Sequence, residues 1–425
     1  GKSRSARWLP TWNLSGAWNA HEESWFEKLK PVLSNFTAKL SYSLTADRGP
    51  SSITNSRAVI KADNPWRPSA SDKESSLYIA WLANQDLTYE KKHELNFGID
   101  AGFLNNRINF TFDIYTRRNY DLIGATNTMG IGGESTKYGN VAKMKSNGVE
   151  LSLNTVNIKT KDFTWSTDFI YSHMHNEVTE LNTYNRLYDY ISGYGFTMPG
   201  YPQRSLFSIP FAGLNNEGLP TFYDPDGNIT VTGIDMQEYD PERLKFLKYE
   251  GPADPTDVGS FGNIFRYKNL TLNLFITYSF GNVVRLDPVF SSRYSDLSAT
   301  PKEFNNRWIK PGDEKYTNIP VIASKQQLNN IADLDRAYQS YNYSTARVAK
   351  GDFIRMKEIS LAYEFPKTIT QALNIANLSL KLQATNLFLL YADKKLNGQD
   401  PEFFNAGGVA TPMPKQFTLT LKFGI

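Results

Sequence analysis

The sequence predicts an all-β protein whose strands form the wall of a transmembrane antiparallel β-barrel. Three observations carry this prediction. Apolar and polar residues alternate with a period of two over long segments, and the connections between these segments alternate between short and long. Apolar runs such as Leu387 to Tyr391 are much too short for a membrane-spanning helix.

The alternation is clearest in the segment 107–117. Ile108, Phe110 and Phe112 stand at even positions, whereas Asn109 and Thr111 stand between them. The segments 36–46, 270–280 and 415–425 repeat this pattern. Because successive side chains of a strand point to opposite faces, each of these strands has one apolar and one polar face. A soluble sandwich and a membrane barrel both produce such strands.

We expect thirteen strands in all. Their ranges are 8–20, 36–46, 94–102, 107–117, 147–156, 163–172, 205–214, 219–226, 259–267, 270–280, 353–365, 377–390 and 415–425.

The connections favour the membrane barrel. Four of them are tight, at 104–106, 159–162, 215–218 and 268–269. Two others on the same side, 21–35 and 366–376, contain predicted helical turns at Trp25–Leu33 and Thr368–Ile375. The intervening connections are long, at 47–93, 118–146, 173–204, 227–258, 281–352 and 391–414. Outer-membrane barrels have short periplasmic turns and long extracellular loops, whereas a soluble sandwich has no physical reason to keep its long loops at one end.

Composition and charge exclude several classes of function. The 425 residues carry 46 Lys and Arg against 43 Asp and Glu, a net charge of +3, which offers no clustered basic surface for nucleic acid. Cys is absent, so disulfides, thiolate metal sites and a cysteine nucleophile are excluded. The four His are scattered and no Ser lies in a Gly-x-Ser-x-Gly turn. We therefore expect no enzyme activity, no cofactor and no metal site.

Aromatic residues make up 14% of the chain, and many stand near the ends of predicted strands. Such positions suit the interfacial aromatic girdles of membrane barrels, although aromatic residues are also ordinary strand formers. The candidates are Trp12, Trp18, Tyr115, Trp165, Tyr171, Tyr278, Phe280, Tyr363, Phe365 and Tyr391.

The last part of the chain carries a series of linked motifs. They read GDFIRMKEISLAYEFP from Gly351, then LSLKLQATNLFLLY, LNGQDPEFF and PMPKQFTLTLKF, and ELNFGIDAGFLNNRINFTFDIYTRRNYDLI and RWIKPGDEKYTNIP precede them. In this order the motifs resemble the C-terminal part of the SusC/RagA family of TonB-dependent outer-membrane transporters. The family typically ends on an aromatic residue, whereas here Phe423 is followed by Gly424 and Ile425.

The resemblance implies an organisation that extends beyond this chain. We expect residues 1–425 to form the C-terminal part of a receptor β-barrel of twenty-two strands. We expect the signal peptide, the TonB-binding segment and the plug of such a receptor to be absent from this chain. Because open sheet edges are costly in hydrocarbon, we expect the chain to be completed by the N-terminal, plug-bearing part of the same transporter.

The resemblance also implies a function. It is active import of a bulky nutrient, an oligosaccharide or a peptide, across the outer membrane of a Bacteroidota-type Gram-negative bacterium. The implied partners are a SusD-like surface lipoprotein, the TonB complex acting through the plug, and outer-membrane lipid. The alternatives are a siderophore or haem receptor of the same wider group and a soluble extracellular β-rich binding protein.

Aromatic residues in two long loops are the candidate contacts for substrate or for the lipoprotein, because their rings are rigid and able to hydrogen-bond. Packing of the loops against themselves is the alternative explanation. The candidates are Tyr188, Tyr190, Tyr194 and Tyr201 in the first loop and Tyr294, Trp308, Tyr338 and Tyr341 in the second.

Overall fold

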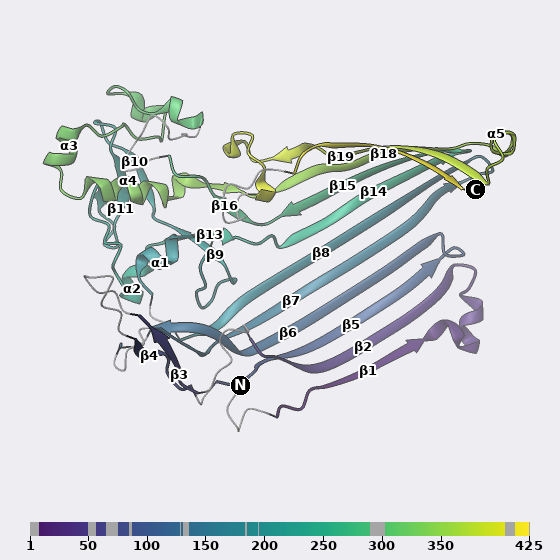
Figure 1. The fold of residues 1–425 in the computed structure, drawn as a ribbon, viewed down its shortest axis with the longest axis horizontal. Coiled ribbons are helices and arrows are strands. Elements are labelled where there is room, and N and C mark those ends of the chain that lie inside the picture. The colour runs from purple at the N-terminus through teal and green to yellow at the C-terminus, as the bar shows by residue number, and fades with distance from the viewer. Residues whose placement is uncertain are drawn as a thin grey trace.

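A single antiparallel sheet of eleven strands dominates the protein (Figure 1). The structure is a computed structural model that describes residues 8–49, 57–64, 75–84, 87–127, 129–130, 136–182, 185–193, 195–289, 302–403 and 413–424. The strands lie in the order β1, β2, β5, β6, β7, β8, β14, β15, β18, β19 and β20. Each strand of the sheet is therefore paired with the strands that precede and follow it in the chain, apart from the short strands in the connections. Their bounds are Trp12–Asn19, Leu33–Asp47, Glu90–Phe103, Ile108–Asn127, Thr136–Lys159, Phe163–Leu181, Asp257–Tyr267, Leu270–Phe280, Phe353–Glu364, Asn377–Ala392 and Gln416–Gly424.

The register keeps apolar residues on one face across neighbouring strands. Phe112 of β6 is paired with Ile99 of β5 and Leu151 of β7, and Leu151 is in turn paired with Tyr171 of β8. At the other side of the sheet, Leu361 of β18 lies between Leu272 of β15 and Leu382 of β19. We call this the apolar face and the opposite one the polar face. The predicted all-β fold with alternating faces is confirmed.

The two ends of the sheet differ as predicted. One end, here the turn end, has the tight turns after β5, β7 and β14, together with short helices. These helices include η2 (Ser24–Lys28) and α5 (Lys367–Ala372), which confirm the two predicted helical turns. The long connections lie at the opposite end, here the loop end (Figure 1). Among the described residues, β1 is paired only with β2 and β20 only with β19, so the sheet has two open edges.

The predicted count of thirteen strands was wrong for this sheet. The segments 205–214 and 219–226 are not wall strands, because they form the short strands β9 (Ser205–Ser208), β10 (Phe211–Leu214) and β11 (Pro220–Tyr223) within a loop. β9 is paired with β13 (Lys248–Pro252), and β11 lies between β10 and β12 (Ile229–Thr230). Short apolar runs bounded by turns look the same in a wall and in a small sheet.

Several wall strands are longer than predicted. β6, β7 and β8 continue toward the loop end well beyond residues 117, 147 and 172, where the strict alternation of apolar and polar residues ends. Alternation of apolar and polar residues marks only the part of a strand that has one face in an apolar environment. These extensions therefore carry no regular periodic signal.

The remaining elements lie in the connections. The hairpin strands are β3 (Val59–Asp63), β4 (Ser76–Trp81), β16 (Val283–Arg285) and β17 (Val348–Lys350), and the α-helices are α1 (Leu187–Ile191), α2 (Pro241–Leu244), α3 (Lys325–Asn330) and α4 (Leu334–Asn342). The other 3-10 helices are η1 (Ala20–Glu22), η4 (Lys302–Asn306), η5 (Asp313–Lys315), η6 (Thr345–Arg347), η7 (Lys394–Leu396) and η8 (Pro401–Phe403).

Tyr115 is not a girdle residue, although it stands near the predicted end of its strand. It lies on the polar face of β6, between Asn96 and Gly148 of the neighbouring strands, and is buried. The guanidinium of Arg117 lies 3.9 Å from the centre of its ring. Gly148 leaves the space that the ring fills, since a Cβ atom there would lie 2.3 Å from the Tyr115 Cζ.

We expect Gly148→Ala to destabilise the sheet by about 1–3 kcal/mol, because the Tyr115 ring would have to leave its position against the strand. Gly16→Ala is the matched control, since nothing lies within 4 Å of a Cβ atom at Gly16. The measurement is the temperature at which the protein loses its heat-modifiable migration on a gel. Equal temperatures for the two variants would contradict this packing role of Gly148.

Candidate functional site

Two long connections at the loop end fold together into one small unit. Residues 182–256 follow β8 and residues 281–352 follow β15, and together we call them the loop module. Figure 1 shows α1, α3, α4, β10 and β11 gathered beyond the loop end of the sheet. The buried apolar residues of both connections form one cluster, which comprises Leu187, Ile191, Ile209, Leu219, Phe222, Ile234, Met236, Leu244, Val289, Ile319, Leu334, Ala337, Tyr338 and Tyr341.

Three of the predicted contact residues lie inside this unit. Tyr341 is 1% exposed, and Tyr338 and Trp308 are each 8% exposed. The Tyr338 hydroxyl donates a hydrogen bond to the Val321 carbonyl at 2.8 Å, and the Trp308 Nε1 donates to Glu314 at 3.0 Å. In this structure all three side chains pack within the loops, as expected if these aromatic residues serve packing of the loops against themselves.

Burial also raises the pKa of two phenols in the loop module, those of Tyr341 and Tyr343. It raises the pKa of Tyr341 to about 12. Burial, together with the phenol of Tyr188, likewise raises the pKa of Tyr343 to about 12. Both groups therefore stay neutral at physiological pH and act only as hydrogen-bonding groups.

Tyr190 and Tyr201 lie at the margin of the same unit. The Tyr190 ring contacts Phe196 and Phe207, with ring centres 4.8 and 6.0 Å apart. The Tyr201 ring lies 5.2 Å from that of Phe207 and 4.8 Å from that of Tyr249. Both are partly buried. Tyr194 and Tyr294 lie outside the described residues.

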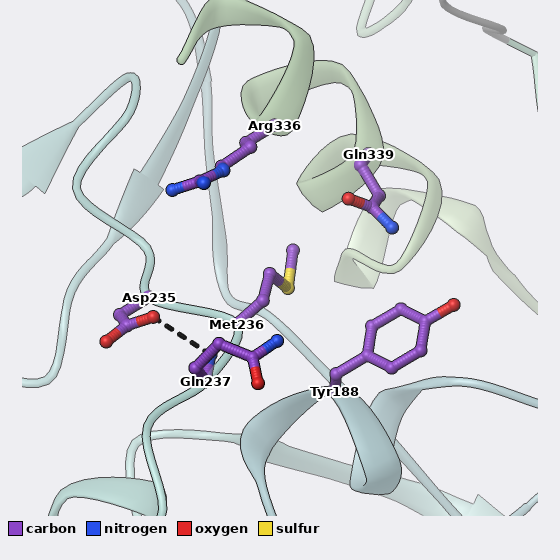
Figure 2. A pocket seen from close by; sticks show the side chains of 6 residues that line it. All are labelled: Tyr188, Asp235, Met236, Gln237, Arg336 and Gln339. Atoms are coloured by element: carbon purple, nitrogen blue, oxygen red, sulfur yellow. Dashed lines mark hydrogen bonds between the residues drawn. The ribbon is translucent and has the colours of Figure 1, made fainter.

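Tyr188 lines a pocket of about 240 Å³ between the two connections (Figure 2). Tyr188 belongs to α1, and its backbone N–H donates to the Met236 carbonyl at 3.1 Å. The other side of the pocket is formed by α4, which supplies Arg336 and Gln339. The full lining is Tyr188, Asp235, Met236, Gln237, Arg336 and Gln339.

The lining is mainly polar, with one carboxylate and one guanidinium. The Asp235 Oδ1 accepts a hydrogen bond from the Gln237 backbone N–H at 2.9 Å, which holds the turn that carries both residues. The Gln237 Oε1 accepts from Arg186 at 2.9 Å. Arg336 is more than half exposed and lies 3.5 Å from Asp333. The pocket thus offers a ring, two amides and two opposite charges to a polar ligand.

Only Tyr188 among the lining residues was predicted from the sequence. Asp235, Gln237, Arg336 and Gln339 are ordinary polar loop residues, and nearly a hundred positions separate the two groups in the chain. No local pattern connects them, since the shared apolar cluster alone brings them together.

Buried arginines support the floor of the loop module. Arg347 is 2% exposed, pairs with Glu303 at 2.5 Å and donates to the Asp287 carbonyl at 2.6 Å. Arg285 donates to the Phe207 carbonyl at 2.5 Å, and burial lowers its pKa to about 10, so that it remains charged at neutral pH.

A further arginine explains two of the sequence motifs. Arg355 of β18 belongs to the motif that begins at Gly351, and its guanidinium pairs with Asp400 and lies 3.3 Å from Glu402. Asp400 and Glu402 flank Pro401 in the loop after β19. The strand motif and the loop motif are therefore two halves of one buried contact.

Neither a metal cluster nor a membrane-spanning helix occurs among the residues that the structure describes. Across the described ranges, no group of three or more His, Asp or Glu side chains could hold a metal ion. Within those ranges, no helix has the length and apolar character needed to cross a membrane.

The curated proteins to which the chain is similar are TonB-dependent receptors. The chain is 26% identical to the TonB-dependent receptor SusC of Bacteroides thetaiotaomicron over 437 residues, which is 99% of this chain and 40% of the relative. It is 25% identical to the TonB-dependent receptor P3 of Formosa agariphila over 409 residues, 91% of this chain and 37% of the relative. No family model matches. The chain spans between 34% and 42% of the curated relatives it matches.

The fold has solved counterparts. The RagAB peptide transporter superimposes with a TM-score of 0.78 at 23% identity, covering 100% of this chain and 44% of that chain. A second structure of RagAB, a peptide importer in the closed-closed state, gives a TM-score of 0.74 at 24% identity. The predicted resemblance to SusC/RagA-type receptors is confirmed by these relatives.

We expect Tyr341→Ala to destabilise the loop module by about 3–5 kcal/mol, because it empties a buried ring site. Tyr316→Ala is the control, since Tyr316 is 90% exposed in the same connection. Limited proteolysis should cut the residues 182–256 faster in the first variant only. Equal cleavage of both variants would show that Tyr341 is not a core residue.

Proposed function

We propose that this chain, a homologue of SusC-type TonB-dependent receptors, forms part of the barrel of an outer-membrane importer for a bulky nutrient. The observation that carries the proposal is the eleven-stranded antiparallel sheet with one continuous apolar face. A sheet satisfies its backbone groups in hydrocarbon only through inter-strand hydrogen bonds, and the apolar face is the one that suits lipid.

In this proposal residues 1–425 are the C-terminal part of the barrel. The edges at β1 and β20 support it, because within the part of the chain that the structure describes each edge strand has a neighbour on one side only. A plug-bearing, N-terminal part of the same transporter pairs with these edges and closes the barrel. Proton-motive energy reaches the plug through the TonB complex, and this chain supplies the wall and the external vestibule.

The loop module is the external part of the transporter. Short turns face the periplasm and long loops face the outside in such barrels, which places the loop end at the cell surface. A SusD-like lipoprotein closes over the loop module, and the transported nutrient is an oligosaccharide or a peptide. The organism is a Gram-negative bacterium of the Bacteroidota type, as SusC and the Formosa receptors suggest.

The pocket that contains Tyr188 is the proposed contact for substrate or for the lipoprotein. Its amides, carboxylate and guanidinium are suited to polar groups, and its ring provides a flat apolar surface. Of the predicted contact residues that the structure describes, Tyr188 is the one that lines this pocket, whereas Tyr190 and Tyr201 are partly buried against Phe207.

Transport and assembly are tested together in a producing strain. Membranes are solubilised, the chain is captured through a tag in an exposed loop, and co-purifying proteins are identified. The proposal expects a plug-bearing polypeptide, or one continuous longer chain, together with a lipoprotein. A deletion strain should lose growth on a polymer or peptide digest. Loss of growth only on an iron chelate would favour a siderophore or haem receptor, and recovery of the chain from the soluble fraction would overturn the membrane assignment.

We expect Arg336→Ala to weaken substrate binding or lipoprotein binding roughly tenfold, because a hydrogen bond to a charged group contributes about 1.5–3 kcal/mol. Arg243→Ala is the matched control, an arginine of similar exposure in the same loop module that pairs with Glu238 instead of lining the pocket. Titration of labelled oligosaccharides, peptides and the lipoprotein separates the two roles. Unchanged affinity for all three would remove the pocket from the proposal.

A further inference from the structure

A row of aromatic rings runs across four adjacent strands on the apolar face at the loop end. The row consists of Trp12 on β1, Tyr42 on β2, His93 on β5 and Tyr120 on β6. The ring centres of Trp12 and Tyr42 are 5.2 Å apart, those of Tyr42 and His93 are 5.7 Å apart, and those of His93 and Tyr120 are 5.7 Å apart. The last two contacts are stacked, with interplanar angles of 14° and 17°.

These rings lie at the loop end of the apolar band. Tyr42 is paired with Leu14 and Leu95, and the other three rings lie one or two same-face positions nearer to the loop end. Leu14, Leu95 and Ile114, on the same face, are all exposed. Trp12 and Tyr42 are themselves 43% and 41% exposed. A row of amphipathic rings at the border of an apolar band marks the headgroup level of a membrane.

Arg118 adds an unpaired positive charge to the row. It is exposed and lies directly opposite His93 in the β5–β6 register. Within the described residues Arg118 has no carboxylate partner, whereas the neighbouring Lys91 pairs with Asp121 and Lys145 pairs with Glu177. Arg118 is therefore the cation that an external anion would meet.

We infer that the ring row and Arg118 form a binding site for a phosphorylated glycolipid of the outer leaflet. This inference rests on the proposed placement of the apolar face in the outer membrane. Guanidinium recognises phosphate through paired N–H groups. Rings on four strands, with neighbouring strands about 4.8 Å apart, span roughly 14 Å, which suits a headgroup built of sugar rings better than a single phosphate.

The surrounding charges set the orientation of the headgroup. The Lys91 ammonium lies 5.4 Å from the centre of the Tyr120 ring and is shared with Asp121. Lys145 lies opposite Arg118 on β7. A phosphate at Arg118 is thus flanked by Lys91, which pairs with Asp121, and by Lys145, which pairs with Glu177 directly opposite it on β8. The sugars lie along His93, Tyr42 and Trp12.

The test uses the transporter purified in detergent from its native outer membrane, with the chains that accompany it. Binding is measured by native mass spectrometry with four probes, which are a bis-phosphorylated lipid A, its dephosphorylated form, phosphatidylglycerol and inorganic phosphate. We expect the phosphorylated lipid A to bind most tightly. Arg118→Gln should weaken its binding roughly tenfold, the scale of one charged hydrogen bond.

Arg266→Gln is the matched control. Arg266 is also an exposed strand arginine with no ion pair within the described residues, but it lies near the turn end of β14, opposite Thr271 of β15 on the polar face. This variant should bind lipid A as the unmodified protein does. His93→Ala tests the rings separately, and it should weaken binding of both forms of lipid A because it interrupts the row.

Several results would overturn the inference. They are equal binding by Arg118→Gln and Arg266→Gln, equal affinity for lipid A with and without its phosphates, tighter binding of phosphatidylglycerol, and full competition by inorganic phosphate. Heat-modifiable migration of each variant confirms that it is folded. Nutrient uptake by Arg118→Gln should be retained, so a failure of this inference is distinct from a failure of the proposed transport function.

Discussion

The register of the eleven-stranded sheet is the constraint on which the rest of the structure depends. Side chains alternate with a period of two, so a slip of one residue between any two strands would exchange the apolar and polar faces from that point onward. The pairing holds the faces in phase from Leu14 and Tyr42 on β1 and β2 to Leu380 and Leu421 on β19 and β20. One face can therefore meet a single apolar surround along the whole sheet.

Bulges maintain this phase where the strands are irregular. Between β15 and β18 the register shifts so that Phe275 is opposite Glu358 and Ile276 is opposite Met356. Between β18 and β19 a second shift brings Met356 opposite Phe388 and Glu358 opposite Thr385. Each bulge bends the strand and adds a residue to it. On the apolar face, Leu274 and Ile276 nevertheless remain paired with Ile359 and Met356 on either side of the shift.

Buried charge stabilises both the loop end of the wall and the loop module. Arg355 pairs with Asp400 at the loop end of β18, and Arg347 pairs with Glu303 inside the loop module. A buried ion pair costs much when one partner is lost, because the other charge is then left in a low-dielectric site. The first pair holds the loop after β19 against the wall, and the second joins two segments of the loop module. The shared apolar cluster holds α4 opposite α1 and keeps the pocket between them.

The same register also sets the position of the ring row. The pairing places Trp12 and His93 at one level on either side of Leu44, and Tyr42 one same-face position nearer to the turn end. Polar residues continue beyond that level, and Arg118 is the first charged residue of β6 on that face. Rings and charge therefore meet at the border of the band.

The sequence by itself determined the wall. The alternation in 107–117 or 270–280, the tight turns and the linked motifs after Gly351 are local signals, and each survives without knowledge of distant residues. It determined neither the extensions of β6 to β8 toward the loop end nor the role of the segment 205–226. Residues outside a continuous apolar environment, or packed around a small local core, have no distinctive period.

Only the tertiary structure decided the contents of the loop module. In the sequence, Tyr338, Tyr341 and Trp308 look the same as aromatic residues of an exposed binding surface. They are buried because two connections far apart in the chain pack around one apolar cluster. The same cluster brings Asp235 and Gln237 to Arg336 and Gln339. Such contacts between segments far apart in the chain follow from packing of whole loops, and packing leaves no periodic trace in either segment.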